Sequence, residues 1–212
     1  MQSLKLKKLF HITAVLSLSY AAQAHAHFDE YMSNARAYLS TYTLDCGYWY
    51  AGAGLGVSHL HDRIPRGGLG YMANNGPGWT AYGGYRFNSL FGVELGYNQY
   101  YQSRHYVPGN GFKTLVAYTN HFSSYIAGVG HFPIYERFSG LVKLGFAYSY
   151  AWKKYTTGTI FRDDTFRPFY GLGLAYSINP RTDLVWEWTE AAGNKKTGSA
   201  DLFTLGFVVG FA

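Results

Sequence analysis

From Tyr48 to the C-terminus, bulky apolar or aromatic side chains alternate with small or charged ones, and the clearest copy of this pattern is Leu141–Trp152. A period of two residues places successive side chains on opposite faces of a β-strand. One face of this copy carries Val142, Leu144, Phe146, Tyr148, Tyr150 and Trp152, and the other carries Lys143, Gly145, Ala147, Ser149 and Ala151. The small face cannot cover a large core, so we expect the bulky face to contact lipid around a narrow polar interior.

The composition is that of a chain with much surface turned away from water. Its 212 residues suit one domain or at most two. Aromatic residues make up 19% and charged residues only 14%, against roughly 25% charged in average soluble domains. After the N-terminal region no apolar run reaches the ~20 residues that a membrane helix needs. A β-barrel is therefore the expected way for this chain to span a bilayer.

The N-terminus has the three parts of a secretory signal. Three lysines precede an apolar core at Leu9–Leu18, and the small-x-small sites Ala22–Ala24 and Ala24–Ala26 follow it. The apolar core is too short for a membrane anchor. We therefore predict a signal peptide over residues 1–26, a periplasmic segment over 27–46 and an outer-membrane β-barrel over 47–212. Export would use the general secretory pathway to the bacterial outer membrane.

Charge and cysteine content exclude some function classes. Removal of the three signal lysines lowers the formal net charge from +6 to +3, which is too weak a balance to indicate a nucleic-acid partner. Cys46 is the single cysteine of the chain, so no intramolecular disulfide can form.

Eight strands can be placed after residue 47, and the links between them alternate in length. The predicted strands are residues 48–59, 79–87, 91–101, 119–131, 140–152, 168–178, 183–189 and 201–211. The links after the second, fourth and sixth strands are short, whereas the others are long and rich in Gly, Pro, Asn and charge. Tight periplasmic turns and long outer loops produce this alternation. The predicted fold class is all-β: an eight-stranded antiparallel up-and-down transmembrane β-barrel whose interior side chains just fill.

Several motifs resemble the transmembrane domain of the outer membrane protein A (OmpA-like) family. They are Trp49–Gly56 with His61-Asp62, Gly83–Asn88 with Gly92–Tyr97, Lys143–Gly145, and Trp186–Thr189. The family's type member also has a periplasmic domain that binds peptidoglycan, and this sequence stops after the eighth strand. In the family, the last strand usually ends in an aromatic residue, whereas in this sequence Phe211 is followed by Ala212.

Four charged residues are expected to form a network in the lumen. By alternation Arg86, Glu94, Lys143 and Glu187 point inward, and Asp183 shares their parity. A Lys or Arg facing lipid at mid-bilayer would cost about 2–4 kcal/mol, and inside a barrel such groups must pair or be hydrated. The network is either a polar core that holds the barrel together or a charge gate in a narrow channel. The resemblance implies an interior carboxylate at Glu94 and an interior base at Lys143, but Gly210 stands where the family has its gate arginine.

An enzymatic alternative rests on two residues of the fourth strand. His121 and Ser123 have the His-x-Ser spacing of the outer-membrane lipid A deacylases, and they share one strand face, as a His-activated nucleophile requires. A carboxylate must also orient the histidine, and neither Glu94 nor Glu136 is placed close to it by the pattern. A polar pair at the membrane interface is the other interpretation.

The remaining residue groups indicate surroundings rather than chemistry. His59 and His61 lie two residues apart but lack an evident third ligand, so no metal site and no cofactor are predicted. Aromatic residues near strand ends form the girdles at the two bilayer boundaries. The basic loop residues that would face lipopolysaccharide phosphate are Lys153, Lys154, Arg162, Lys195 and Lys196.

Together these features predict a non-enzymatic outer-membrane barrel with a structural or surface-interaction role and, as a further expectation, a narrow pore. The alternative is a lipid A-modifying enzyme that uses His121 and Ser123. Expected partners are outer-membrane lipids and lipopolysaccharide, with host-surface or envelope partners at the loops and no nucleic acid. The barrel is expected to be a monomer.

Overall fold

The computed structural model describes residues 47–61, 70–109, 112–193 and 198–211, so the predicted signal peptide and periplasmic segment lie outside the described residues. The described residues form ten β-strands. These are β1 Tyr48–Leu60, β2 Tyr71–Ala73, β3 Asn75–Arg86, β4 Phe91–Gln99, β5 Ser103–Gly109, β6 Phe112–Tyr135, β7 Phe138–Tyr155, β8 Ile160–Asn179, β9 Thr182–Ala191 and β10 Ala200–Phe211. No helix among the described residues is long and apolar enough to cross a membrane.

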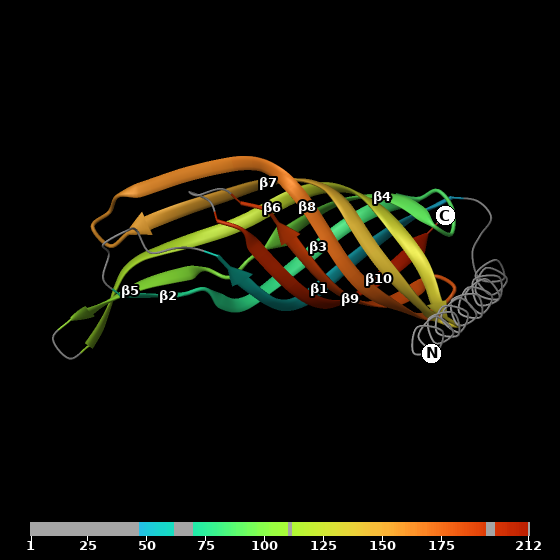
Figure 1. Cartoon of the computed structure of the whole chain (residues 1–212), viewed down its shortest axis with the longest axis horizontal. Coiled ribbons are helices and arrows are strands. Elements are labelled where there is room, and N and C mark those ends of the chain that lie inside the picture. Colours follow the sequence, from blue (N-terminus) through green and yellow to red (C-terminus); the bar gives the residue numbers. More distant parts are fainter. Residues whose placement is uncertain (1–46, 62–69, 110–111, 194–197, 212) are drawn as a thin grey trace, which may run out of the picture.

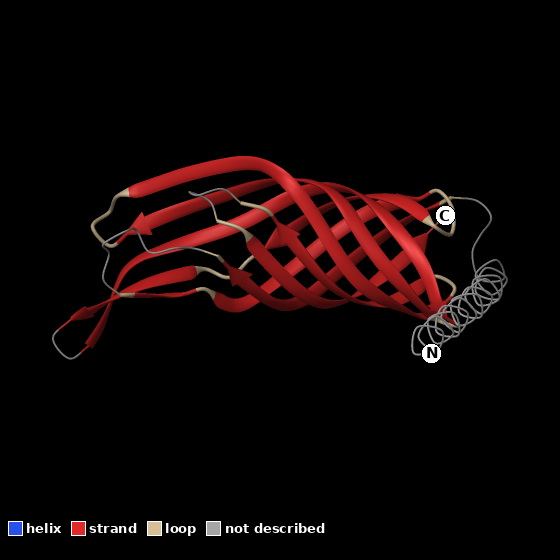
Figure 2. Ribbon diagram, in the orientation of Figure 1, coloured by secondary structure: helices blue, strands red, loops and turns tan. Residues whose placement is uncertain are grey.

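Eight of these strands close into an antiparallel barrel (Figure 1, Figure 2). Around the barrel the order is β1, β3, β4, β6, β7, β8, β9 and β10, and β10 pairs with β1 from Trp49↔Phe211 to Leu60↔Ala200. Every strand of this ring has two neighbours, so the ring leaves no sheet edge at membrane depth. The predicted fold class is therefore confirmed.

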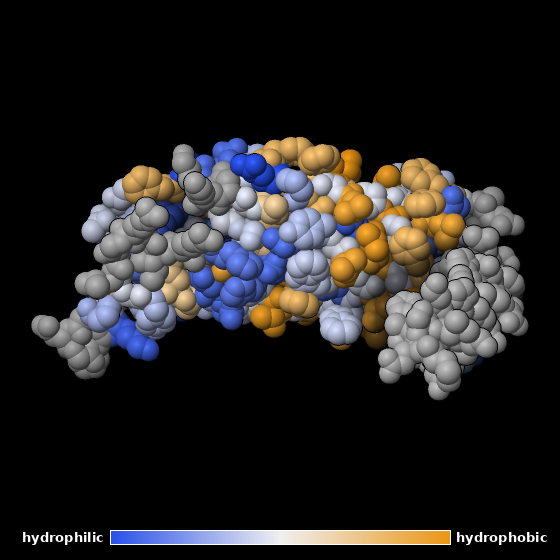
Figure 3. Space-filling view, viewed as in Figure 1, coloured by the Kyte–Doolittle hydropathy of each residue, from blue (hydrophilic) through white to orange (hydrophobic). Residues whose placement is uncertain are grey.

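The strand pleat separates a bulky outer face from a polar inner one. On the outside, Leu55 is 75% exposed and Leu144 is 65% exposed, whereas the inward Glu94 and Lys143 are each 2% exposed. Figure 3 shows the apolar side chains gathering over the part of the barrel that lies toward the short turns. Because no soluble core could leave such large apolar groups uncovered, this outer face is matched to lipid.

The short links are tight turns, as the sequence predicts. The connection between β6 and β7 consists of residues 136–137, and that between β8 and β9 consists of residues 180–181. Between β3 and β4, the Asn88 side-chain oxygen accepts hydrogen bonds from the backbone N–H groups of Leu90 and Phe91, both at 2.8 Å. These turns and the two ends of the barrel sequence, Tyr48 and Phe211, lie at one end of the molecule.

At the opposite end the strands are longer than predicted. β6, β7 and β8 begin or end well beyond the predicted ranges 119–131, 140–152 and 168–178, and β2 and β5 occupy a stretch expected to be loop. Figure 1 shows β5 to β8 extending past the barrel. β5 pairs with β6, and β7 pairs with β8 as far as Lys154↔Ile160. Backbone pairing continues there because it needs only a neighbouring strand, while the apolar and polar contrast that marks a strand in lipid is lost in water.

Candidate functional site in the barrel lumen

Three charged side chains meet in the middle of the lumen, each from a different strand. Glu94 comes from β4, Lys143 from β7 and Glu187 from β9. The register places Lys143 opposite Gly171 and Glu187 opposite Gly173. These two glycines lie on β8, between Lys143 and Glu187, and carry no side chain, so Lys143 has room to reach Glu187.

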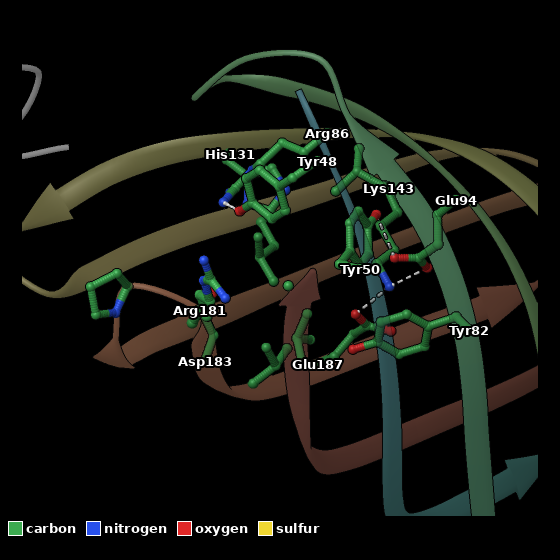
Figure 4. Close-up of a pocket in the computed structure, with 17 residues that line it drawn as sticks. Tyr48, Tyr50, Tyr82, Arg86, Glu94, His131, Lys143, Arg181, Asp183 and Glu187 are labelled. Carbon is green, nitrogen blue, oxygen red and sulfur yellow. Dashed lines mark hydrogen bonds and ion pairs between the residues drawn. The ribbon is translucent and has the colours of Figure 1, made fainter. Parts of the chain in front are cut away.

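The lysine is shared between the two carboxylates. Lys143 Nζ lies 2.6 Å from Glu94 Oε1 and 2.6 Å from Glu187 Oε2, and all three side chains are buried (Figure 4). Taking three ionised groups out of water is costly unless their geometry is good and further hydrogen bonds satisfy them. We call Glu94, Lys143 and Glu187 the lumen triad.

Three tyrosines complete the surroundings of the triad. The Tyr125 hydroxyl donates to Glu94 Oε1 at 2.7 Å, and the Tyr50 hydroxyl donates to Glu94 Oε2 at 3.1 Å. The ammonium of Lys143 stands over the Tyr82 ring, 4.2 Å from its centroid, which is within cation–π range. Both oxygens of Glu94 are therefore hydrogen-bonded.

Inward glycines make room for these tyrosine rings. A Cβ atom added at Gly96 would lie 2.3 Å from the Tyr125 ring, and one added at Gly52 would lie 2.5 Å from the Tyr82 ring. No real Cβ contact is that short, so a larger residue at either position would displace the ring.

On the loop side of the triad, a layer of apolar side chains lies among small polar ones such as Ser58, Thr80 and Asn98. Tyr125 stacks on Phe169 with ring centroids 4.1 Å apart. Phe169, Leu60 and Leu202 are each at most 1% exposed. Together with the triad they fill the cross-section, as expected for the interior of a barrel with eight strands.

On the short-turn side of the triad lies a cavity (Figure 4). Its polar lining includes Tyr48, Arg86, His131, Arg181 and Asp183 in addition to the triad. The cavity reaches the turn between β8 and β9, where Arg181 is exposed. Water can therefore approach the triad from this end, whereas Phe169, Leu60 and Leu202 on the other side are almost completely buried.

The structure brings together only part of the predicted charge network. Arg86 lies apart from the triad: its Nη1 donates to the Tyr48 hydroxyl at 2.7 Å, and its guanidinium lies 5.8 Å from the Tyr48 ring centroid. Asp183 lines the same cavity. Arg86 lies nearer the short turns than Glu94, because it is the last residue of β3 and pairs with Gly92. A network that includes all four predicted residues therefore stays a prediction.

The two residues of the enzymatic alternative point into the lumen. His121 and Ser123 are both buried on the inner face of β6. The Ser123 and Tyr100 hydroxyls are 2.9 Å apart in a hydrogen bond. A group in this position does not face the bilayer.

The histidine pair at the loop end of β1 has partners of its own. His59 Nδ1 is hydrogen-bonded to the Asn75 side chain, and His61 Nδ1 lies 3.8 Å from Asp201 Oδ2. Within the described parts of the chain, no group of three His, Cys, Asp or Glu residues is arranged to hold a metal ion.

Sequence reasoning missed the tyrosines and His131. Tyr50, Tyr82 and Tyr125 were open to detection, because alternation points each of them inward on a strand whose other inward residues are mostly small. Their positions opposite inward glycines are a second signal, but using it requires the strand register.

A closed barrel of eight strands, apolar outside and polar inside, defines a bacterial outer-membrane β-barrel. Residues 45–211 match the family described as OmpA-like transmembrane domain, and the chain belongs to this family. In barrels of this class the short turns face the periplasm, so the cavity opens toward the periplasm and β5 to β8 extend outward.

Curated relatives agree with this family. The chain is 30% identical over 165 residues to Outer membrane protein A of Escherichia coli O157:H7, an alignment that covers 70% of this chain and 42% of the relative. It is 32% identical over 169 residues to Outer membrane protein A of Shigella flexneri, covering 70% and 43% respectively. The chain thus spans less than half the length of these relatives.

Solved structures show the same fold at low sequence identity. Ail, the attachment invasion locus protein of Yersinia pestis, superposes with a TM-score of 0.52 at 17% identity, covering 78% of this chain and 99% of that one. OprG from Pseudomonas aeruginosa has a TM-score of 0.54 at 13% identity, covering 80% and 98%. At such identities the likeness concerns the fold alone.

Proposed function

We propose that this chain is a non-enzymatic outer-membrane barrel with a structural and surface-interaction role, and that the lumen triad keeps its interior closed. The observation that carries the proposal is the sharing of Lys143 by Glu94 and Glu187 beneath the apolar layer of Phe169 and Leu202. A filled interior stabilises the barrel. The surface available to partners is then the part of β5 to β8 that extends past the barrel, which we call the outer extension.

The outer extension supplies that surface. β7 and β8 pair from Tyr148↔Phe166 to Lys154↔Ile160, beyond the level at which β9 joins β8 at Phe169↔Ala191. Lys153, Lys154 and Arg162 lie in this part. Their charges suit the phosphate groups of lipopolysaccharide, because cation-to-phosphate hydrogen bonds are among the stronger ones.

The lipid A deacylase alternative is less well supported by the geometry. Its substrate would lie in the outer leaflet, whereas His121 and Ser123 face inward and Ser123 is fully buried. A nucleophile must come within bonding reach of its substrate. Lipid A mass spectra from cells with and without the protein test this point: we expect no acyl loss, and a loss abolished by His121→Ala would contradict the proposal.

A narrow pore is a second candidate, favoured by the cavity that reaches the triad from the periplasmic side. Conduction would require Lys143 to leave one carboxylate and the apolar layer to part. In planar bilayers we expect the wild-type barrel to be almost always closed and Lys143→Ala to raise the open fraction. Lys154→Ala, on the outer extension, is the matched control. Equal conductance in wild type and Lys143→Ala would remove the triad from any closing role.

A further inference from the structure

The periplasmic cavity contains buried polar atoms that have no hydrogen-bond partner in the described chain. Both ring nitrogens of His131 are buried and have no hydrogen-bond partner among the described residues, and neither has Arg86 Nε. Buried polar atoms are almost always satisfied by protein or by bound molecules. His131 and Arg86 line the same cavity, on the side where Figure 4 shows them beside Tyr48.

The charged groups around these unpartnered nitrogens favour an anion over a cation as the ligand. Deepest in the cavity, Glu94 accepts hydrogen bonds from two tyrosines, and Lys143 Nζ forms ion pairs with Glu94 and Glu187. Glu187 Oε2 has no hydrogen-bond partner among the described residues, and its charge is balanced by that ion pair. The groups nearer the periplasmic rim include the guanidinium groups of Arg86 and Arg181. A carboxylate suits a guanidinium because two parallel hydrogen bonds can form.

The rest of the cavity wall is apolar. Leu141, Ala175 and Val185 form a buried cluster, Val208 packs against it, and all four line the cavity. A ligand that fills this space thus needs a charged head for the basic groups and a short hydrocarbon tail for the apolar part of the wall. Small-molecule sites typically combine an apolar lining with a few well-placed polar groups in this way.

We propose that the periplasmic cavity binds a small organic monocarboxylate, with its carboxylate at Arg86, His131 and Arg181 and its tail against Leu141, Val185 and Val208. Asp183 faces the same cavity and opposes the anion. This charge limits the affinity and provides a substitution expected to strengthen binding. The proposal goes beyond the structural role and depends neither on conduction nor on surface interactions.

The test is a titration of the folded barrel in lipid nanodiscs with sodium butyrate, followed by NMR shifts of the Leu141 and Val185 methyl groups, which line the cavity and are kept in every variant. Inorganic phosphate and butylamine are the comparison probes, because phosphate lacks the tail and butylamine reverses the charge. Arg181→Gln and His131→Phe should each weaken butyrate binding by about tenfold, the effect of losing a hydrogen bond to a charged group. Asp183→Asn should tighten it. Arg104→Gln, an exposed arginine on the outer extension, is the matched control and should change nothing.

Arg181 is exposed in a turn, so its variant tests binding without endangering the fold. Saturable binding of butyrate that both variants weaken supports the proposal. Equal shifts with butyrate and phosphate would overturn the monocarboxylate assignment, since the apolar wall would then play no part. No saturable butyrate shift, or one that Arg181→Gln and His131→Phe leave intact, would overturn the site itself.

Discussion

Lys143 is the residue on which the interior charge balance depends. It is the one described cation within 2.6 Å of Glu94 and Glu187, and all three side chains are almost completely buried. Removal of one partner of a buried ion pair leaves the other charge uncompensated, which costs far more than the intact pair contributes.

Lys143→Met should therefore destabilise the barrel by about 3–5 kcal/mol, measured as the free energy of unfolding in urea with the protein in lipid vesicles. The triple variant Glu94→Gln, Lys143→Met, Glu187→Gln removes all three charges and should lie closer to wild type than the single one. A single variant as stable as wild type would show that the carboxylates do not need the lysine.

Gly96 tests the packing around the triad. Gly96→Ala should displace Tyr125 from Glu94, because the new Cβ would lie 2.3 Å from the ring. Overpacking of this kind costs about 1–3 kcal/mol, read from the same urea unfolding curves. Gly83→Ala is the control, since its Cβ would meet only one atom at 3.6 Å. Equal effects of the two substitutions would contradict the packing described for Tyr125.

At the residue scale, alternation predicts whether a side chain points inward or outward, but not its position along the barrel axis. Glu94, Lys143 and Glu187 were predicted to face inward, and they do. Arg86 shares their parity but lies near the end of its strand, beside Tyr48. The position along the axis depends on the stagger between neighbouring strands. Strand pairing sets this stagger, and the sequence of a single strand does not reveal it.

At the scale of elements, the strands divide into a part matched to lipid and a part matched to water. Leu144 and Phe161 are both large apolar side chains, 65% and 59% exposed. Leu144 lies on β7 next to Lys143 at mid-barrel, whereas Phe161 lies on the outer extension of β8, paired with Lys153. Similar exposed fractions therefore mean contact with lipid for Leu144 and contact with water for Phe161.

Leu144→Arg should cost about 2–4 kcal/mol of folding free energy in vesicles, because a charge at mid-bilayer leaves water. Phe161→Arg should stay within about 0.5 kcal/mol of wild type, as surface substitutions usually do. If both substitutions cost the same, the boundary between the bilayer part and the outer extension is misplaced.

The sequence prediction is best for the lipid-matched parts of the strands and fails beyond them. All eight barrel strands were found, with their short turns, because lipid on one side and a narrow lumen on the other enforce the contrast between faces. β2, β5 and the outer parts of β6 to β8 were predicted as loop. Water reaches both faces there, so residues such as Lys153, Asp164 and Arg167 weaken the contrast without preventing backbone pairing.

At the scale of the whole molecule, the closed ring turns a repeated strand pattern into a membrane protein. Pairing of β1 with β10 joins the two ends of the barrel sequence and leaves no open edge in the bilayer. The alternation of short and long links indicated the up-and-down order in advance. Which of the inward charges would meet, and the periplasmic cavity, could not be predicted, because both depend on side chains that converge from strands distant in sequence.

The most direct test is the oxygen accessibility of nitroxide spin labels along β10 in lipid vesicles, after Cys46→Ser removes the native thiol. Labels at Leu205, Phe207 and Val209, which face outward, should show high accessibility to oxygen dissolved in lipid. Labels at Thr204 and Val208, which face the lumen, should show low accessibility. An accessibility profile with a period of two residues and this phase is the predicted result, and a flat or inverted profile would contradict the lipid-facing barrel.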